Sequence, residues 1–249
     1  MRNLMAVVEY DGTCYHGFQA QPERRTVQGE LEAALERIIG ASVRVAGAGR
    51  TDAGAHALAQ VVSFRTHSQM GNDAIARAWN ALLPEDAAVK EVRDVPEAFH
   101  ARHSALRRWY RYTIVNREAP PALGRGYAHH IRRPLSVEMM EQASGWLVGS
   151  HDFRAFGASR NTVRRVDRAN CFREGERVLI DLVANAFLPG MARSIAGTLI
   201  RVGMSHISTE GFQSILEQGD RALAGPTAPA KGLCLMAVYY READTNENL

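Results

Sequence analysis

The chain has 249 residues, enough for one large domain or two of ordinary size, and 46% of them are hydrophobic, so it can bury a substantial core. Its formal net charge is only +3 at pH 7, but 28 of its 30 basic residues are arginine, since only Lys90 and Lys231 are lysine. A genome-wide coding bias would explain this excess, yet arginine still offers a planar fork that suits phosphates and stacks on bases.

Three features of the composition bear on compartment and metal content. The cysteines, Cys14, Cys171 and Cys234, include no C-x-x-C pair, which argues against a disulfide framework and a structural zinc site. The opening MRNLMAVVEYDG turns polar too early for a signal peptide, and no apolar run approaches the roughly 18 residues of a membrane span. The histidines show no metal-ligand spacing. We therefore expect a soluble, cytoplasmic protein with neither a metal nor a membrane segment.

The first half of the chain is predicted to run strand, helix, strand, strand, helix, strand. MAVVEY opens it, and a helix follows in which Thr26 caps the start and Gly40 marks the end. SVRVAGAG and ALAQVVSF are expected as strands on either side of a glycine-rich loop. Asn72 is expected to cap a second helix that Pro84 stops, and AAVKEVRDV forms the next strand. This order is the ferredoxin-like pattern.

The second half resembles the first in outline. RWYRYTIVN alternates as a strand, Ser136 starts a helix, and RVLIDLVANAF is a further strand. Pro189 is expected in the first turn of the next helix, a helix is suggested over residues 209–219, and GLCLMAVYY is expected as the last strand. We therefore predict an α+β fold of two ferredoxin-like or RRM-like halves, residues 1–103 and 104–249.

The most unusual segment is GAGRTDAGAH, residues 47–56, which has an acid at its centre. It is neither a dinucleotide fingerprint, because Asp52 stands where the third glycine is needed, nor a P-loop, because Gly54 is followed by Ala55. Asp52 is either a turn cap or a reactive carboxylate. Arg50, two residues earlier, favours its ionised form, and the glycines leave room for a ligand; both suit a nucleophile or base.

Basic residues gather in two stretches. Residues 101–133 carry eight arginines against one acid, Glu118, interleaved with aromatic residues along a predicted strand. Such a strand suits RNA, because it offers phosphate contacts and stacking platforms, so nucleic acid is the favoured partner there. Residues 154–177 carry seven arginines against three acids, and a solvated face explains them equally well.

A third segment, NAFLPGMARSIAGTLIRVG (residues 185–203), places a charge beside an apolar helical stripe. Arg193 is costly to bury there unless it finds a partner. Either it extends to solvent, or it pairs with a carboxylate, for which Asp52 is the candidate.

These segments together resemble a known family. GAGRTDAGAHALAQVVSF, RRWYRYTIVN and NAFLPGMARSIAGTLIRVG, in this order, look like the three signature blocks of the tRNA pseudouridine synthase A family, and VEYDGTCYHGFQAQPERRTVQGELEAAL resembles its N-terminal segment. The resemblance covers nearly the whole chain. It implies the pseudouridine synthase fold, in which the two halves share a mostly antiparallel sheet with a central cleft. It also implies a homodimer that needs no cofactor and converts uridine to pseudouridine at positions 38, 39 and 40 of the tRNA anticodon stem-loop.

The resemblance also assigns roles to five residues. Asp52 corresponds to the catalytic aspartate, and Arg50 would help to hold the flipped nucleotide or the space it leaves. Tyr110, the first tyrosine of W-Y-R-Y, would stack on the uracil. Arg193 would orient Asp52 through a salt bridge, and Leu199 would add an apolar wall.

Two positions depart from the family pattern, and two other functions compete with the isomerase. Pro189-Gly190 stands where histidines are frequent, and Trp109 where a basic residue is common; the first puts substrate contacts in doubt rather than the reaction. A catalytically silent tRNA-binding protein on the same scaffold would be free to lose Asp52, Tyr110 or Arg193, and all three are present. A phosphate-handling hydrolase would need a phosphate loop or metal ligands, which the sequence lacks.

Overall fold

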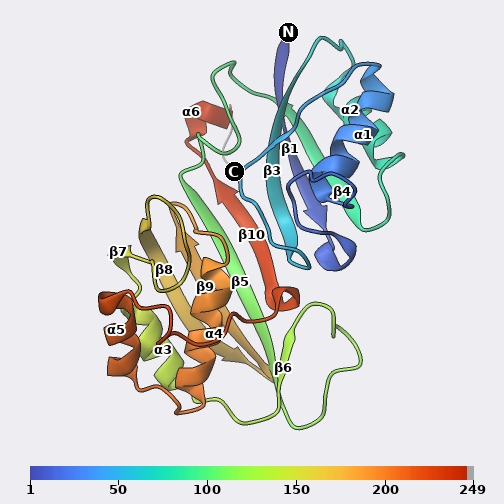
Figure 1. Ribbon diagram of the computed structural model, residues 1–249. Helices are drawn as coiled ribbons and strands as arrows, with labels where there is room; N and C mark the ends of the chain where they lie inside the picture. Colours follow the sequence, from blue (N-terminus) through green and yellow to red (C-terminus); the bar gives the residue numbers. More distant parts are fainter. Residues whose placement is uncertain (246–249) are drawn as a thin grey trace. The chain divides into compact units, whose positions relative to one another are not determined.

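The structure is a computed structural model that describes residues 1–245, and its contacts divide the chain into two compact units (Figure 1). Unit 1 comprises residues 1–108 and the described residues from 235 onward, and unit 2 comprises residues 109–234. The final strand thus packs into unit 1, although it follows unit 2 in the sequence. The boundary between residues 103 and 104 stays a prediction, and residues 246–249 of the expected C-terminal half lie outside the described residues.

Unit 1 is a sheet with two helices on one face (Figure 1). The strand order is β4-β1-β3-β10, with the short β2 paired to β3, and the printed pairings of β1 with β3 and β4 are antiparallel. The elements of unit 1 are β1 (Arg2–Tyr10), η1 (Gly12–Cys14), α1 (Val27–Ile39), β2 (Ala46–Gly47), β3 (His56–Thr66), α2 (Asn72–Asn80), β4 (Ala87–Asp94), β10 (Leu233–Tyr239) and α6 (Glu242–Thr245).

The helix α1 begins and ends where the sequence predicts. The Thr26 side chain accepts a hydrogen bond from the Gly29 N–H, and Gly40 ends the helix in the left-handed region at φ 74°. The core beneath the helices centres on Trp79 of α2, which is fully buried. Its indole N–H donates to the Leu31 carbonyl at 3.1 Å, and its ring meets Phe64 edge to face.

Two local expectations in unit 1 are wrong. Gly71, not Asn72, is the N-cap of α2, because the Asn72 side chain is occupied by Arg2 and Asp94 instead. The strand expected over residues 42–49 shrinks to Ala46–Gly47. Side chains of α1 satisfy the backbone hydrogen-bonding groups of Val45, the residue before β2. The carboxylate of Glu32 accepts from the Val45 N–H, and the amide of Gln28 donates to the Val45 carbonyl.

The strands of unit 2 follow the order β5-β9-β8-β7, and α3, α4 and α5 lie together on one face of them (Figure 1). β7, β8 and β9 pair antiparallel, and the short β6 runs parallel to β5. The elements of unit 2 are β5 (Arg107–Asn116), β6 (His129–Ile131), α3 (Val137–Gly145), β7 (Gly149–Asp152), β8 (Val163–Glu174), β9 (Arg177–Ala184), α4 (Met191–Gly203), α5 (Thr209–Gln218) and η2 (Ala230–Gly232).

Unit 2 confirms most elements that the sequence predicts. Ser136 caps α3 through a hydrogen bond from the Met139 N–H, as expected. Pro189 lies outside α4 rather than in its first turn, because Gly190 forms the N-cap with φ 71°. β8 is not predicted at all, since its frequent arginines hide the buried alternation of residues 166, 169 and 171.

The two units confirm an α+β fold of two similar, mostly antiparallel halves. In unit 1 the order β4-β1-β3-β2 is that of a ferredoxin-like βαββαβ motif, and β5-β9-β8 in unit 2 repeats the β1-β3-β2 part of this order. A sheet shared by both halves and a central cleft remain predictions.

An ion cluster anchors the segment that follows β1. The guanidinium of Arg25 donates to both carboxylate oxygens of Asp86 at 2.8 and 2.9 Å and to Glu30 at 3.1 Å. The Tyr15 hydroxyl donates to Asp86 at 2.6 Å, and the guanidinium lies 4.3 Å from the centre of the Tyr15 ring. Burial by itself raises the pKa of Asp86, but the hydrogen bonds from Arg25 and Tyr15 outweigh it and hold this pKa below its ordinary value.

The lowered pKa of Asp86 predicts a specific loss of stability in acid. The folded state favours the ionised carboxylate of Asp86. Its contribution to the free energy of unfolding is therefore complete above the unfolded-state pKa of about 4, and it disappears as the pH falls through the lower folded-state pKa. Asp86→Asn should lower the free energy of unfolding by about 1–3 kcal/mol at pH 7. The difference from the wild type should narrow below about pH 4, which urea unfolding at several pH values measures. A difference that is constant with pH would contradict the ion cluster.

Candidate active site

The loop of residues 47–56 connects β2 to β3 and carries Asp52 at its centre, half-buried, with Arg50 exposed. Two neighbouring strands hold the residues before Asp52. The hydroxyls of Tyr10 and Thr51 are hydrogen-bonded at 2.8 Å. The Gln60 amide brackets Gly49, accepting from its N–H at 3.2 Å and donating to its carbonyl at 2.6 Å. The backbone at the base of the loop is therefore fixed by buried hydrogen bonds.

The segment after β1, residues 11–18, packs directly against the same loop. The Phe18 N–H donates to the Thr51 carbonyl at 3.1 Å, and the Gly54 N–H donates to the Tyr15 carbonyl at 3.3 Å. The backbone is thus held on both sides of Asp52. The ion cluster of Arg25 and Asp86 holds the Tyr15 side chain, so hydrogen bonds connect the cluster through Tyr15 to the loop of Asp52.

Glycines allow this close packing. At Gly12, a Cβ atom would lie 1.9 Å from the Ala55 carbonyl oxygen, and at Gly17, whose φ is +90°, it would lie 2.9 Å from that of Thr51. Gly47 differs from the expectation that the loop glycines leave room for a ligand, because the Phe18 ring occupies that space, 2.3 Å from an ideal Cβ.

Arg108, one of the eight arginines of the basic stretch, has a structural role in unit 1. Its side chain is buried, and its guanidinium donates to the backbone carbonyls of Ala48, Ala105 and Arg102. The expectation that the basic stretch of residues 101–133 contacts nucleic acid therefore does not extend to Arg108, which is buried. It secures the start of the glycine-rich loop instead.

In unit 2, strand β5 separates its aromatic residues onto two faces. Tyr110 and Tyr112 share one face, and Trp109 and Arg111 share the other, because side chains alternate along a strand. Tyr110 is buried and meets the ring of Phe187 edge to face, with the ring centres 4.8 Å apart.

The other face of β5 carries an ion pair beside an indole ring. The guanidinium of Arg111 donates one hydrogen bond to each carboxylate oxygen of Asp181, both at 2.8 Å. The guanidinium groups of Arg111 and Arg168 lie 5.3 and 5.4 Å from the centre of the Trp109 ring. Trp109, which departs from the family pattern, therefore has two cationic neighbours.

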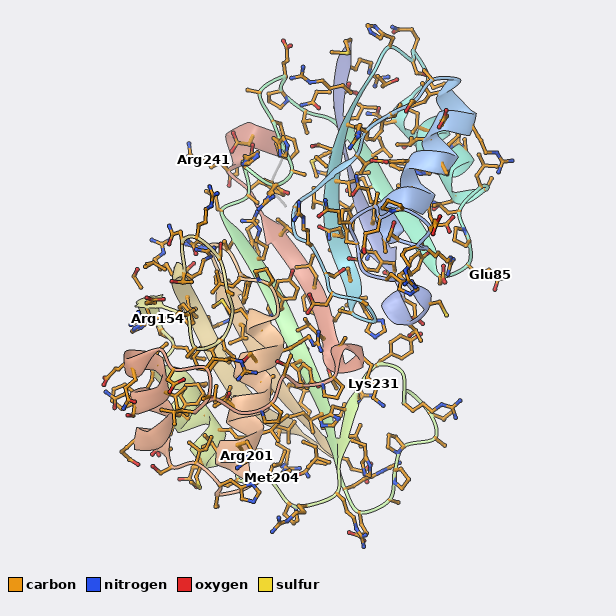
Figure 2. All side chains as sticks on the ribbon, viewed as in Figure 1. Glu85, Arg154, Arg201, Met204, Lys231 and Arg241 are labelled. Atoms are coloured by element: carbon orange, nitrogen blue, oxygen red, sulfur yellow. The ribbon has the colours of Figure 1, made fainter. Side chains whose placement is uncertain are left out.

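Arg193 lies in the first turn of α4, the end opposite to Arg201 and Met204, which are labelled in Figure 2. Its side chain is half-buried, and its Nε–H donates to the Ala228 carbonyl at 2.8 Å. Arg193 therefore does not simply extend to solvent, the first of the two alternatives. Leu199, two turns along the helix, is fully buried.

The candidate residues belong to different units. Asp52 and Arg50 lie in unit 1, whereas Tyr110, Arg193 and Leu199 lie in unit 2. Within unit 2, Arg193 donates to the Ala228 carbonyl and the Tyr112 hydroxyl donates to the adjacent Pro229 carbonyl, so α4 and the tyrosine face of β5 contact the same segment. The salt bridge between Asp52 and Arg193, and the roles of all five residues, remain predictions.

Neither a cluster of metal-ligating side chains nor a membrane-spanning helix occurs in the part of the chain that the structure describes. Within residues 1–245, no group of three or more His, Cys, Asp or Glu side chains could hold a metal ion. Across the same residues, no helix has the length and apolar character needed to cross a membrane.

Sequence reasoning missed the residues that hold the candidate side chains. These are Tyr10, Gln60 and Arg108 around the loop, and the carbonyl of Ala228 at Arg193. A backbone carbonyl leaves no trace in a sequence. The glycines of DGTCYHGF were the one available signal, because two glycines five residues apart in a loop indicate close backbone contacts.

Comparisons with known proteins relate the chain to one family. A family model described as tRNA pseudouridine synthase matches residues 6–104 and 143–241. The chain is 41% identical to tRNA pseudouridine synthase A of Geotalea daltonii, over 96% of this chain and all of the relative. It is 43% identical to proteins of the same name from Thermoanaerobacter sp. strain X514 (96% of this chain, all of the relative) and Moorella thermoacetica (95% and 99%).

The family match covers both the loop of Asp52 and the helix of Arg193, and the relatives extend over essentially the full chain. The chain therefore belongs to the tRNA pseudouridine synthase family, a family of isomerases.

Proposed function

We propose that this enzyme isomerises uridine to pseudouridine at positions 38, 39 and 40 of the tRNA anticodon stem-loop, with Asp52 as the catalytic group. The observation that carries this proposal is the rigid mounting of Asp52, whose neighbours Thr51 and Gly54 are both hydrogen-bonded to the segment of residues 11–18. A turn cap alone needs no such support on both sides. A carboxylate that must react with one atom of a substrate needs this support, because the reaction rate depends steeply on the position of the catalytic group.

The reaction explains the residue types. It breaks the N1–C1′ bond, turns the uracil and joins C5 to C1′; C5 loses a proton and N1 gains one, so no net oxidation, hydrolysis or phosphate transfer occurs and no cofactor is required. The Asp52 carboxylate either attacks C1′ or removes a sugar proton to give a glycal-like intermediate. Both routes use the same ionised, fixed aspartate.

The uridine must leave its stack before it can react, which costs a few kcal/mol. We propose that Tyr110 offsets this cost by stacking on the uracil, while Arg50 holds the flipped nucleotide or the space it leaves. Arg193 pairs with Asp52 and keeps it charged and oriented, and Leu199 contributes an apolar wall. The edge-to-face contact with Phe187 supports the role of Tyr110, because it holds the tyrosine ring in one orientation.

The arginines available to tRNA are fewer than the sequence suggests. Among residues 101–133, Arg111, Arg117 and Arg132 pair with carboxylates, and Arg108 is buried. Arg102, Arg125 and Arg133 are exposed and suited to phosphate contacts. We further propose that the enzyme acts in the cytoplasm as a homodimer. A catalytically silent tRNA-binding protein is the alternative that the following experiments exclude or support.

Replacing the reactive carboxylate should abolish the reaction without abolishing binding. Asp52→Asn is expected to lower turnover by a factor on the order of 10⁴ or more, with tRNA affinity nearly unchanged, because the amide keeps the size of the carboxylate but not its charge. Mapping pseudouridine in tRNA after incubation with each variant measures this. Asp73→Asn, at an exposed aspartate of α2, is the control. Turnover by Asp52→Asn near the wild-type rate would show that Asp52 is not the catalytic group.

Stacking can be separated from a role of the Tyr110 hydroxyl. Tyr110→Ala should lower kcat/KM by about ten- to a hundredfold, because a base stacked on an aromatic ring gains about 1–3 kcal/mol. Tyr110→Phe keeps the ring and should retain most of the activity. Steady-state kinetics on one tRNA substrate distinguish the two variants. An equal loss in both would assign the role to the hydroxyl rather than to stacking.

Exposed arginines should contribute to the salt dependence of tRNA binding. Arg125→Ala and Arg133→Ala are each expected to weaken binding and to reduce the slope of log affinity against log salt by about 1. Binding titrations at several salt concentrations measure this slope. Arg37→Ala, at an exposed arginine of α1, should leave it unchanged. Slopes equal to that of the wild type would remove residues 125 and 133 from the RNA-binding surface.

A further inference from the structure

Arg193 is held by a chain segment that no motif identifies. Residues 225–229, here called the strap, run across the first half of α4. The Ala228 carbonyl accepts from the Nε–H of Arg193 at 2.8 Å, and the Ala228 N–H donates to the Arg193 carbonyl at 3.1 Å. One strap residue therefore binds both the side chain and the backbone of Arg193.

The strap is fixed to α4 at a second point, one turn further along the helix. The Thr198 hydroxyl accepts from the Gly225 N–H at 2.9 Å and donates to the Ser194 carbonyl at 2.8 Å. Thr198 is fully buried, so neither bond competes with water. A β-branched residue inside a helix is thus used as a hydrogen-bonding bridge rather than as a packing group.

Two glycines let the strap and the helix touch. A Cβ atom at Gly197 would lie 1.8 Å from the Pro226 carbonyl oxygen, and one at Gly225 would lie 2.7 Å from the Gly197 carbonyl oxygen. A side chain at position 197 would have to displace the strap backbone by more than about 1 Å to reach ordinary contact distance.

The strand β5 holds the far end of the strap. The Tyr112 hydroxyl donates to the Pro229 carbonyl at 2.9 Å, and Tyr112 is almost completely buried. Burial raises the pKa of this hydroxyl, so it remains a donor at physiological pH. The strand that carries Tyr110 therefore supports the strap that holds Arg193.

We propose that the strap is a positioning element for the isomerisation, and that Thr198, Gly197 and Tyr112 act through it. A guanidinium has five N–H donors in one plane. Because the Ala228 carbonyl takes the Nε–H, the strap fixes the plane of Arg193 and leaves its terminal nitrogens for the pairing with Asp52 that is proposed above. This inference rests on the role proposed above for Arg193, and none of the three strap-holding residues touches the substrate.

The test uses pairs of matched variants of the full chain. Thr198→Val removes the bridge but keeps the β-branched shape, and it should lower kcat about two- to tenfold, the effect of one hydrogen bond, with KM for tRNA within about twofold. Thr198→Ser should restore the rate. Gly197→Ala should lower kcat by about a hundredfold, because a shift of about 1 Å at a positioned group can cost that much. Gly145→Ala, at a helical glycine with open space around it, is the control.

A second arm separates positioning from a general loss of structure. In an Arg193→Ala background, Thr198→Val should cause no further loss of the single-turnover rate, since the side chain that the strap holds is gone. A further loss of the same size would assign the strap a purely structural role. Wild-type kcat in both Thr198→Val and Gly197→Ala, or a rise in KM alone, would also overturn the proposal. If Arg193→Ala itself is fully active, the role of Arg193 fails instead, so the two failures are distinguishable.

Discussion

The packing of one backbone segment against another, residues 11–18 on the loop of residues 47–56, is the constraint on which the catalytic proposal depends. The contact is between main chains, since Phe18 and Gly54 donate to carbonyls across it and glycines remove the side chains that would keep the segments apart. A carboxylate on such a loop cannot relax freely towards solvent. The cost of ordering the loop is met during folding rather than during the reaction.

Asp52 and Arg193, the two residues proposed to pair in the active site, are supported in the same manner. Asp52 is fixed through Thr51 and Gly54, and Arg193 through the Ala228 carbonyl of the strap. In both cases a buried hydroxyl or amide holds the support: the Tyr10 hydroxyl and the Gln60 amide for the loop, and the Thr198 hydroxyl for the strap. These three groups are uncharged, whereas the guanidinium of Arg108 holds the start of the loop at the Ala48 carbonyl.

The sequence predicted the regular elements better than their contacts. Thr26, Gly40 and Ser136 mark helix ends correctly, because caps are local interactions between neighbouring residues. β2 was predicted too long, since Glu32 and Gln28 of the preceding helix satisfy the backbone of Val45, just before β2. β8 was not predicted because arginines interrupt its apolar pattern.

The candidate site was predictable as a set of residues but not as a geometry. The motif around Asp52, the W-Y-R-Y strand and the helix of Arg193 are sequence features, and the family match covers the first and third of them. The burial of Arg108 and the strap at Arg193 depend on backbone carbonyls of residues far away in the chain, and no residue type encodes a carbonyl.

The most direct test of the account is a structure of the Asp52→Asn variant bound to tRNA. The account predicts a flipped uridine whose base lies on the Tyr110 ring, with its C1′ atom about 3–3.5 Å from the side chain of residue 52. Arg193 should contact that side chain through its terminal nitrogens. A target uridine that remains stacked in the anticodon stem-loop, or whose sugar lies far from residue 52, would contradict it.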